Sequence, residues 1–282
     1  MVVILNITTM KKNNINLINF LYNLFVIIDD FIQFLPNVIG KNKGRKTSLK
    51  PSETISIMLF GLFQGLKTRF DLFKHIYTYH LKEFPNLPSY KSFNELINKY
   101  SNKALQILYI IMNYNIQNSS QMIKFIDATS IAVCKNKRIF KHKVCDGVAK
   151  RGKSTMGWFY GFKLHICVNE QGKLLSCRIT PGNTDDRTPV EDLLTQIKGL
   201  VVADAGYVSA ELTHKLKQKG VQFMTGVRKT MKKLMTKGQH KVLKARQIVE
   251  SAFGVMKQSE NLVSSYARSV AGHFSRIVYA LL

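Results

Sequence analysis

Hydrophobic residues before position 118 recur at helical spacing. The apolar positions from Leu17 to Leu35, and again from Ile55 to Phe63, fit a period of 3.6 residues. Pro36 ends the first run, and Pro51 opens the second near its first turn. Similar signals continue over 70–79 and 92–111. The pattern therefore predicts a mainly α-helical N-terminal region over residues 1–118.

The pattern changes after residue 119 to short runs with strand character. Strands are predicted at 124–133, 156–169, 173–180, 200–203 and 221–227. Helices are predicted after Pro189, over 210–219 and over 242–258. Three consecutive strands favour an antiparallel meander, and strands that return through helices favour parallel pairing. This order resembles the RNase H fold, so residues 119–282 are predicted to form an α/β domain: an RNase H-like five-stranded mixed sheet with flanking helices.

Two features of the N-terminal region bear on its partners. The predicted helices 55–63 and 70–79 are joined by a short turn, with Lys67 and Arg69 beside it. This pattern fits a DNA-binding helix-turn-helix or a plain helical hairpin. The apolar run before Pro36 contains Asp29 and Asp30, whose burial in a bilayer is costly. It is therefore predicted to be an amphipathic helix packed in the protein, with no membrane partner.

Charge narrows the function classes. The chain has 42 Lys and Arg against 17 Asp and Glu, a net charge of +25. Such a charge favours a polyanionic partner, above all nucleic acid. Eight cations fall between residues 135 and 153: Lys135, Lys137, Arg138, Lys141, Lys143, Lys150, Arg151 and Lys153. This run fits a track for DNA phosphates or a merely solvated surface.

The four cysteines form no C-x-x-C pair. This spacing does not fit a zinc ribbon, and reduced thiols in a cytoplasmic, nucleoid-associated protein are expected.

Three carboxylates lie on three different predicted elements. Asp127 interrupts the first strand, Asp204 follows the fourth strand, and Glu250 lies on the last helix. If the first and fourth strands are neighbours, the two Asp side chains meet at one edge, and a crossing helix can add the Glu. Each residue alone fits a turn, cap or solvated position. Together they fit a site for two Mg²⁺ (or Mn²⁺) ions about 3.5–4 Å apart, because these cations prefer oxygen ligands.

Other polar residues are candidates for contacts with DNA. Arg246 and Lys257 lie four residues before and seven after Glu250, on one helical face, where they could hold phosphates or form surface ion pairs. Lys163 and His165 lie on the second strand, where a histidine could also be a buried core residue. Asp185 and Asp186 fit loop acids, the preferred interpretation, or additional metal ligands. Trp158 fits a core residue, the preferred interpretation, or a platform on which bases stack.

Several motifs occur in the order typical of one family. FIDATSI surrounds Asp127, VVADAGYVS surrounds Asp204, and R-x3-E-x6-K spans residues 246–257. From about residue 25 onward the chain resembles the DDE transposases of bacterial insertion sequences. One departure is Leu243, where many relatives carry Tyr.

The resemblance implies an RNase H-like catalytic core and two divalent cations held by Asp127, Asp204 and Glu250. It also implies cleavage at terminal inverted repeats of double-stranded DNA and strand transfer into target DNA, by a homodimer on the DNA. Two alternatives stay open from the sequence. One is a metal-dependent nuclease of the same fold, and the other is an inactive DNA-binding remnant, suggested by the apolar end at Leu282.

Overall fold

The structure is a computed structural model that describes residues 16–36, 47–155, 157–227, 235–259 and 267–282. The chain divides into two compact units. Of the described residues, one unit contains 16–36, 47–111, 256–259 and 270–282, and the other contains 112–155, 157–227, 235–255 and 267–269. The sequence-based division at 118/119 stays a prediction of functional domains. In the packing, residues 112–118 group with the second unit, and residues 256–259 and 270–282 group with the N-terminal helices.

The first unit is helical, as predicted. Its helices are α2 (Leu17–Phe34), α3 (Pro51–Gln64), α4 (Arg69–Tyr79), most of α5 (Tyr90–Gln117) and α10 (Val270–Leu281). The side chains of Phe20 and Phe63 pack ring against ring, with centroids 4.2 Å apart, and join α2 to α3. Tyr279 of α10 is fully buried, and its hydroxyl donates to the carbonyl oxygen of Ile97. These contacts build one apolar core from segments far apart in sequence.

Helix α2 is less buried than the sequence predicts. Only Phe20, Leu21 and Ile28 are buried, whereas Tyr22 and Val26 are more than half exposed. By length and composition α2 is the one described helix that could cross a membrane. It packs against α3 through its buried stripe, and the predicted absence of a membrane partner stays a prediction.

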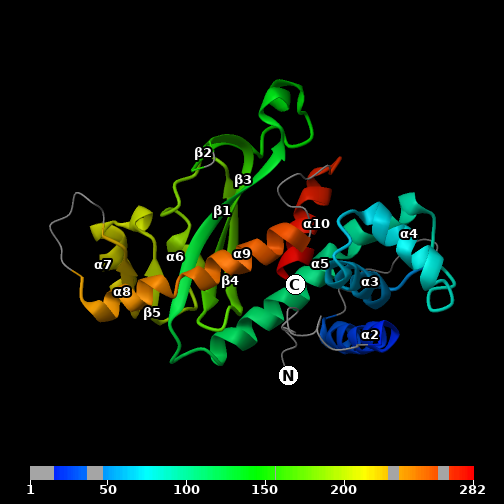
Figure 1. The fold of residues 1–282 in the computed structure, drawn as a ribbon, viewed down its shortest axis with the longest axis horizontal. Helices are drawn as coiled ribbons and strands as arrows, with labels where there is room; N and C mark the ends of the chain where they lie inside the picture. Colours follow the sequence, from blue (N-terminus) through cyan, green and yellow to red (C-terminus); the bar gives the residue numbers. More distant parts are fainter. Residues whose placement is uncertain (1–15, 37–46, 156, 228–234, 260–266) are drawn as a thin grey trace. The chain divides into compact units, whose positions relative to one another are not determined.

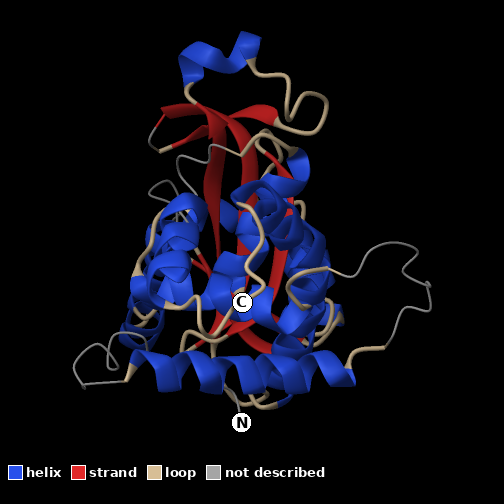
Figure 2. Ribbon diagram, turned by 90° about the vertical axis from the view of Figure 1, so that its right-hand side faces the viewer, coloured by secondary structure: helices blue, strands red, loops and turns tan. Residues whose placement is uncertain are grey.

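The second unit is built on a mixed sheet, drawn as arrows in Figure 1 and in red in Figure 2. Its strands are β1 (Lys124–Cys134), β2 (Lys150–Ser154), β3 (Gly157–Asn169), β4 (Leu174–Pro181), β5 (Gly199–Ala203) and β6 (Val221–Thr225). β1, β3 and β4 form an antiparallel meander, with β1 on one edge of β3 and β4 on the other. β5 pairs in parallel with β1, and β6 pairs in parallel with β5.

The resulting order, β4-β3-β1-β5-β6, is that of an RNase H-like fold, and the predicted fold class is confirmed. The predicted turn between β3 and β4 is also present, with Gly172 at a positive φ of 76°. A sixth strand, β2, was not predicted. It pairs with residues 157–161 of β3, while β4 pairs with residues 162–168 of the same edge.

Short helices connect the later strands: α6 (Val190–Leu193) lies between β4 and β5, and α7 (Ala210–Gln218) between β5 and β6. After β6, this unit continues with α8 (Lys237–Lys244) and the first part of α9 (Gln247–Ser259). The apolar faces of α6 and α7 pack on the sheet around Ile126, Val201 and Ala203, all fully buried. The core of this unit therefore lies directly beside the strand segments that carry Asp127 and Asp204.

Candidate active site

Asp127 lies on β1 just beyond the stretch that pairs with β5. That pairing joins Lys124 to Val201 and Phe125 to Val202, so the two strands part before residue 127. The Asp127 side chain is 23% exposed, and its Oδ1 accepts a hydrogen bond of 2.8 Å from the backbone N–H of Ala128. The carboxylate is thus held at a fixed angle at the point where the strands separate.

Asp204 follows β5 directly. Because β1 and β5 run parallel, their carboxyl ends point to the same edge of the sheet. Asp204 caps the short helix η2 (Ala205–Tyr207), and its Oδ1 accepts a 2.6 Å hydrogen bond from the backbone N–H of Ala205. Asp127 and Asp204 are therefore oriented in the same way, each by the N–H of the next residue.

Glu250 and Arg246 come from the start of α9. The Arg246 guanidinium donates from Nη1 to Asp127 Oδ2 over 2.9 Å and from Nη2 to Glu250 Oε1 over 3.3 Å. Asp127 and Arg246 are separated by 119 residues in sequence, so this contact fixes the start of α9 over β1. The Arg246 side chain is 19% exposed and the Glu250 side chain 56% exposed. The carboxylates of β1 and α9 are thus joined through one cation.

The last helix differs from the sequence prediction. One helix was predicted over 242–258, whereas α8 ends at Lys244 and α9 begins at Gln247. At the break the backbone N–H groups of Arg246 and Val249 donate to carbonyl oxygens three residues earlier, which tightens the chain into a turn. The predicted clustering of Arg246 with Glu250 is nevertheless present across this turn.

The pKa values at the site are shifted by neighbouring negative charges. Burial is the main cause that raises the pKa of Asp127, and the charges of Asp204 and Glu250 raise it further. The Ala128 N–H and the Arg246 guanidinium oppose this rise. Tyr207, which sequence reasoning did not single out, is buried beside the same charges, and its pKa is raised chiefly by burial and next by Asp127. The sequence feature that could have pointed to Tyr207 is its position three residues after Asp204, in the segment ADAGY.

The donor set fits a hard divalent cation. Asp127, Asp204 and Glu250 offer carboxylate oxygens, which Mg²⁺ and Mn²⁺ prefer. Three carboxylates without a cation would repel one another, and the structure balances two of them with Arg246. Asp127 and Glu250 are thus joined through Arg246, and Asp204 lies near enough to raise the pKa of Asp127. The catalytic and metal-binding roles of the three residues stay predictions.

The predicted DNA contacts of the basic run lie on exposed surface. Lys137, Arg138 and Lys141 belong to the short helix η1 (Asn136–Lys141), and Lys143 follows it. Arg151 and Lys153 lie on β2 and face Trp158 of β3. The interpretation of Trp158 as a core residue is wrong, because its side chain is 51% exposed. The side chains are placed where a polyanion could reach them.

Lys163 and His165 need a correction. His165 is 1% exposed, and its Nε2 lies 2.9 Å from the Thr180 hydroxyl, so it is a buried sheet residue. Burial lowers its pKa to about 4, which keeps it neutral near pH 7. Lys163 Nζ donates to Thr184 O and to Asp186, and its side chain is 15% exposed. Both residues hold the β3–β4 region together and are not placed at a DNA-accessible surface.

The loop acids and Lys257 have different surroundings. Asp185 pairs with Arg187 over 2.7 Å, as expected of a loop acid, while Asp186 pairs with Lys163. Lys257 lies in the last turn of α9 and is partly buried. It belongs to the helical unit, so its role beside Glu250 stays a prediction.

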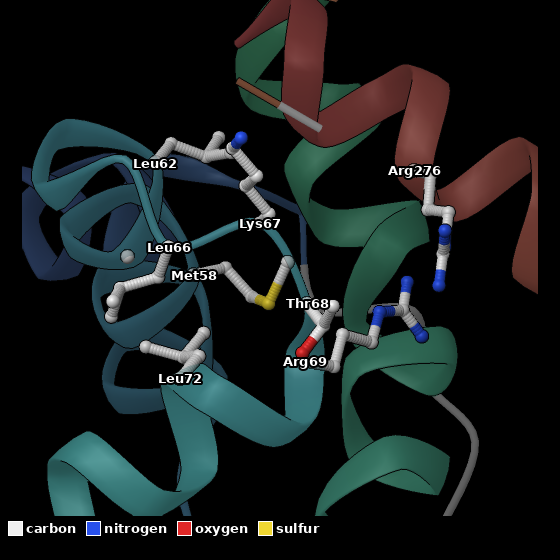
Figure 3. Close-up of a pocket in the computed structure, with 9 residues that line it drawn as sticks. Met58, Leu62, Leu66, Lys67, Thr68, Arg69, Leu72 and Arg276 are labelled. Carbon is white, nitrogen blue, oxygen red and sulfur yellow. The ribbon is translucent and has the colours of Figure 1, made fainter. Parts of the chain in front are cut away.

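The helix-turn-helix interpretation is weakened by Arg69. Its guanidinium donates from Nη1 to Asn98 and from Nη2 to Ser275 within the helical unit, and the residue is 8% exposed. Figure 3 shows Arg69 and Arg276 beside a small pocket, whose volume of about 10 Å³ holds no more than a water molecule. Arg69 therefore acts as a packing residue here, and DNA binding by the α3–α4 pair stays a prediction.

Comparisons with known proteins give one family match and one similar solved structure. A family model described as "Transposase DDE domain" matches residues 117–270, more than half of the chain, and includes all three carboxylates. Among solved structures, the chain is similar to a piggyBac transposase synaptic complex with hairpin DNA, determined by cryo-EM. The identity is 10% and the TM-score 0.45, over 92% of this chain and 70% of that one. No curated protein matches the sequence.

Proposed function

The chain belongs to the DDE-domain transposase family, and from this premise we propose that it is an insertion-sequence transposase. In this proposal it cleaves DNA strands at the ends of a mobile element and joins them to target DNA. The observation that carries the proposal is the Arg246 bridge, which holds Asp127 of β1 and Glu250 of α9 together beside Asp204. Solvated surface acids have no need of such an arrangement.

We assign the binding of two divalent cations, Mg²⁺ or Mn²⁺, to Asp127, Asp204 and Glu250. Such ions, when bound, activate an attacking oxygen and stabilise the leaving oxygen of a phosphodiester. The protein's own contribution is orientation. The N–H groups of Ala128 and Ala205 each hold one carboxylate oxygen, so little reorganisation is needed at the site.

Arg246 has a positioning role in this account. Its guanidinium favours the ionised form of Asp127 and so opposes the rise in pKa that burial causes. The sequence alone predicted that Arg246 binds DNA phosphates. The structure supports a first role toward the carboxylates, because the hydrogen-bond partners of Arg246 are Asp127 and Glu250.

The proposed partner is double-stranded DNA, including terminal inverted repeats and target DNA, bound by a homodimer in the cytoplasm at the nucleoid. The net charge of +25 and the exposed cations between residues 135 and 153 support this partner. Arg151 and Lys153, on β2, extend the same basic surface along the sheet.

The test is metal-dependent nicking of DNA that carries the inverted repeats flanking the coding region. Asp127→Asn, Asp204→Asn and Glu250→Gln should each abolish nicking while DNA binding is retained, because each removes a charge with little change of shape. Asp192→Asn is the matched control, since Asp192 is an exposed acid outside the site. Near-normal nicking by any of the three variants would remove that residue from the site.

A further inference from the structure

The segment Lys135–Ala149 extends beyond the end of the sheet, and we call it the projection. Figures 1 and 2 both show it beyond the strands, with η1 near its tip. It contains five cations: Lys135, Lys137, Arg138, Lys141 and Lys143. Its one acid, Asp146, accepts a hydrogen bond from the Gly147 N–H. Among the described residues, none of the five cations lies within 4.0 Å of a carboxylate oxygen.

Phe140 is the unusual residue of the projection. Its side chain is 97% exposed, the highest value among the exposed large hydrophobic residues that the structure describes. It lies in η1 between Arg138 and Lys141, both exposed. A ring held in water forgoes the free energy of burial. Its position among unpaired cations indicates a partner that offers both negative charge and an apolar surface.

The base of the projection is held firmly. Asn136 Nδ2 donates to the carbonyl oxygen of Trp158 over 2.6 Å, which fixes the start of η1 to β3. The Arg151 guanidinium lies 4.9 Å from the Trp158 ring centroid, and Lys153 Nζ lies 5.8 Å from it. A Cβ on Gly152 would clash with the Gly182 carbonyl oxygen, so β2 sits tightly against the turn after β4. The projection therefore presents Phe140 from a fixed base.

We propose that the projection kinks duplex DNA, with Phe140 inserted between two base pairs and the flanking cations bound to phosphates on either side. This inference rests on the proposed function, from which it takes DNA as the partner. Stacked base pairs offer the apolar surface that Phe140 lacks, and the phosphates offer the matching charge. Apolar wedges of this kind part base steps and bend the duplex by about 20–90°.

The position of the projection also sets its distance from the carboxylates. Trp158, at its base, lies eight residues along β3 from Ile166, the partner of Asp127. An extended strand of that length spans about 26 Å. That distance corresponds to about eight base steps of 3.4 Å. Because Phe140 lies farther out than Trp158, the kink is expected about eight base pairs or more from the scissile phosphate.

The experiment measures bending of a duplex with a central TA step, which parts easily, and dyes at its two ends. Energy transfer between the dyes reports the bend, and anisotropy of the same duplex reports binding. The full chain is used without divalent metal, so that no cleavage intervenes. The wild-type protein should increase energy transfer. Phe140→Ala should abolish the increase while affinity falls by about tenfold or less, because the unstacking cost is lost together with the contact.

Three further variants make the result specific. Phe140→Leu should keep the bend, since leucine is also an apolar wedge. Arg138→Ala should keep the bend but reduce the salt slope of binding by about one phosphate. Phe34→Ala, which removes an 84% exposed ring from a helix that carries Asp29 and Asp30, should change neither.

An unbent duplex with bound wild-type protein, or an undiminished bend with Phe140→Ala, would overturn the inference and leave the proposed function standing. Tighter binding to single-stranded DNA of the same length, without bending, would also overturn it. Absence of any DNA binding would overturn both. Loss of nicking with normal bending would contradict only the proposed function.

Discussion

The contact between Arg246 and Asp127 should make a measurable contribution to stability. Their atoms are 2.9 Å apart, and the side chains are 19% and 23% exposed, so solvent screens the pair only partly. A hydrogen bond to a charged group at such a site contributes about 1.5–3 kcal/mol. The second contact, to the exposed Glu250, should add no more than about 0.5 kcal/mol. Arg246→Gln is therefore expected to destabilise the unit by about 1.5–3 kcal/mol near pH 7.

A double-mutant cycle isolates this pair. Urea unfolding of wild type, Arg246→Gln, Asp127→Asn and the double variant is followed in metal-free buffer. Trp158 is the one tryptophan in the chain and lies in the second unit, so its fluorescence reports the unit that contains the pair. The coupling energy should be about 1.5–3 kcal/mol. A value within about 0.5 kcal/mol of zero would show a screened surface pair and refute the positioning role of Arg246.

The pH dependence supplies an internal check. Burial raises the pKa of Asp127 in the folded protein, and loss of Arg246 should raise it further. A carboxyl whose pKa is raised on folding stabilises the protein fully below its unfolded pKa, and that contribution is lost as pH rises through the folded pKa. The destabilisation by Arg246→Gln should therefore vanish below about pH 4 and grow toward neutral pH. Equal destabilisation at both ends would contradict the assignment.

Three other outcomes are expected. With at least six phosphates contacted, DNA affinity should fall by about 10³ or more between about 50 and 200 mM salt, and a titration with a slope near one phosphate would contradict a DNA-tracking surface. Burial lowers the pKa of His165 to about 4, so the free energy of unfolding should fall by up to about 3 kcal/mol as pH drops from about 6.5 to 4. In urea unfolding at several pH values, His165→Gln should flatten this part of the pH profile. An unchanged profile would show that another group is responsible. Lys257→Ala should slow single-turnover cleavage of pre-bound DNA about 10–150-fold if it contacts a phosphate near the site, whereas a rate within about twofold of wild type would make it a helix-surface residue.

The sheet could be predicted from sequence because its strands are apolar and bounded by turn residues. The predicted runs at 124–133 and 173–180 correspond closely to β1 and β4. β2 was missed because Lys150–Ser154 contains two further cations and a glycine. Its strand conformation comes from pairing with β3, a tertiary contact that local pattern does not reveal.

The sequence predicted which residues form the site better than it predicted their contacts with one another. Asp127 drew attention because carboxylates are disfavoured inside strands, and Asp204 because it ends a buried strand. The bridge by Arg246 depends on a break between α8 and α9 that no proline or glycine marks. The burial of His165 and Arg69 was also hidden, because each is polar in sequence and is held by partners on other elements. Phe140 shows the reverse case, an apolar residue that the fold leaves in water.

The most direct test of the central claim is strand transfer. The purified chain is incubated with Mg²⁺, a target plasmid and a labelled duplex that ends in the inverted repeats flanking its coding region. The account predicts labelled duplex joined covalently to the plasmid, and no joined product from Glu250→Gln. Metal-dependent cleavage without joining would indicate a nuclease of the same fold, and binding with neither cleavage nor joining would indicate an inactive remnant; either result would contradict the claim that this chain is an active transposase.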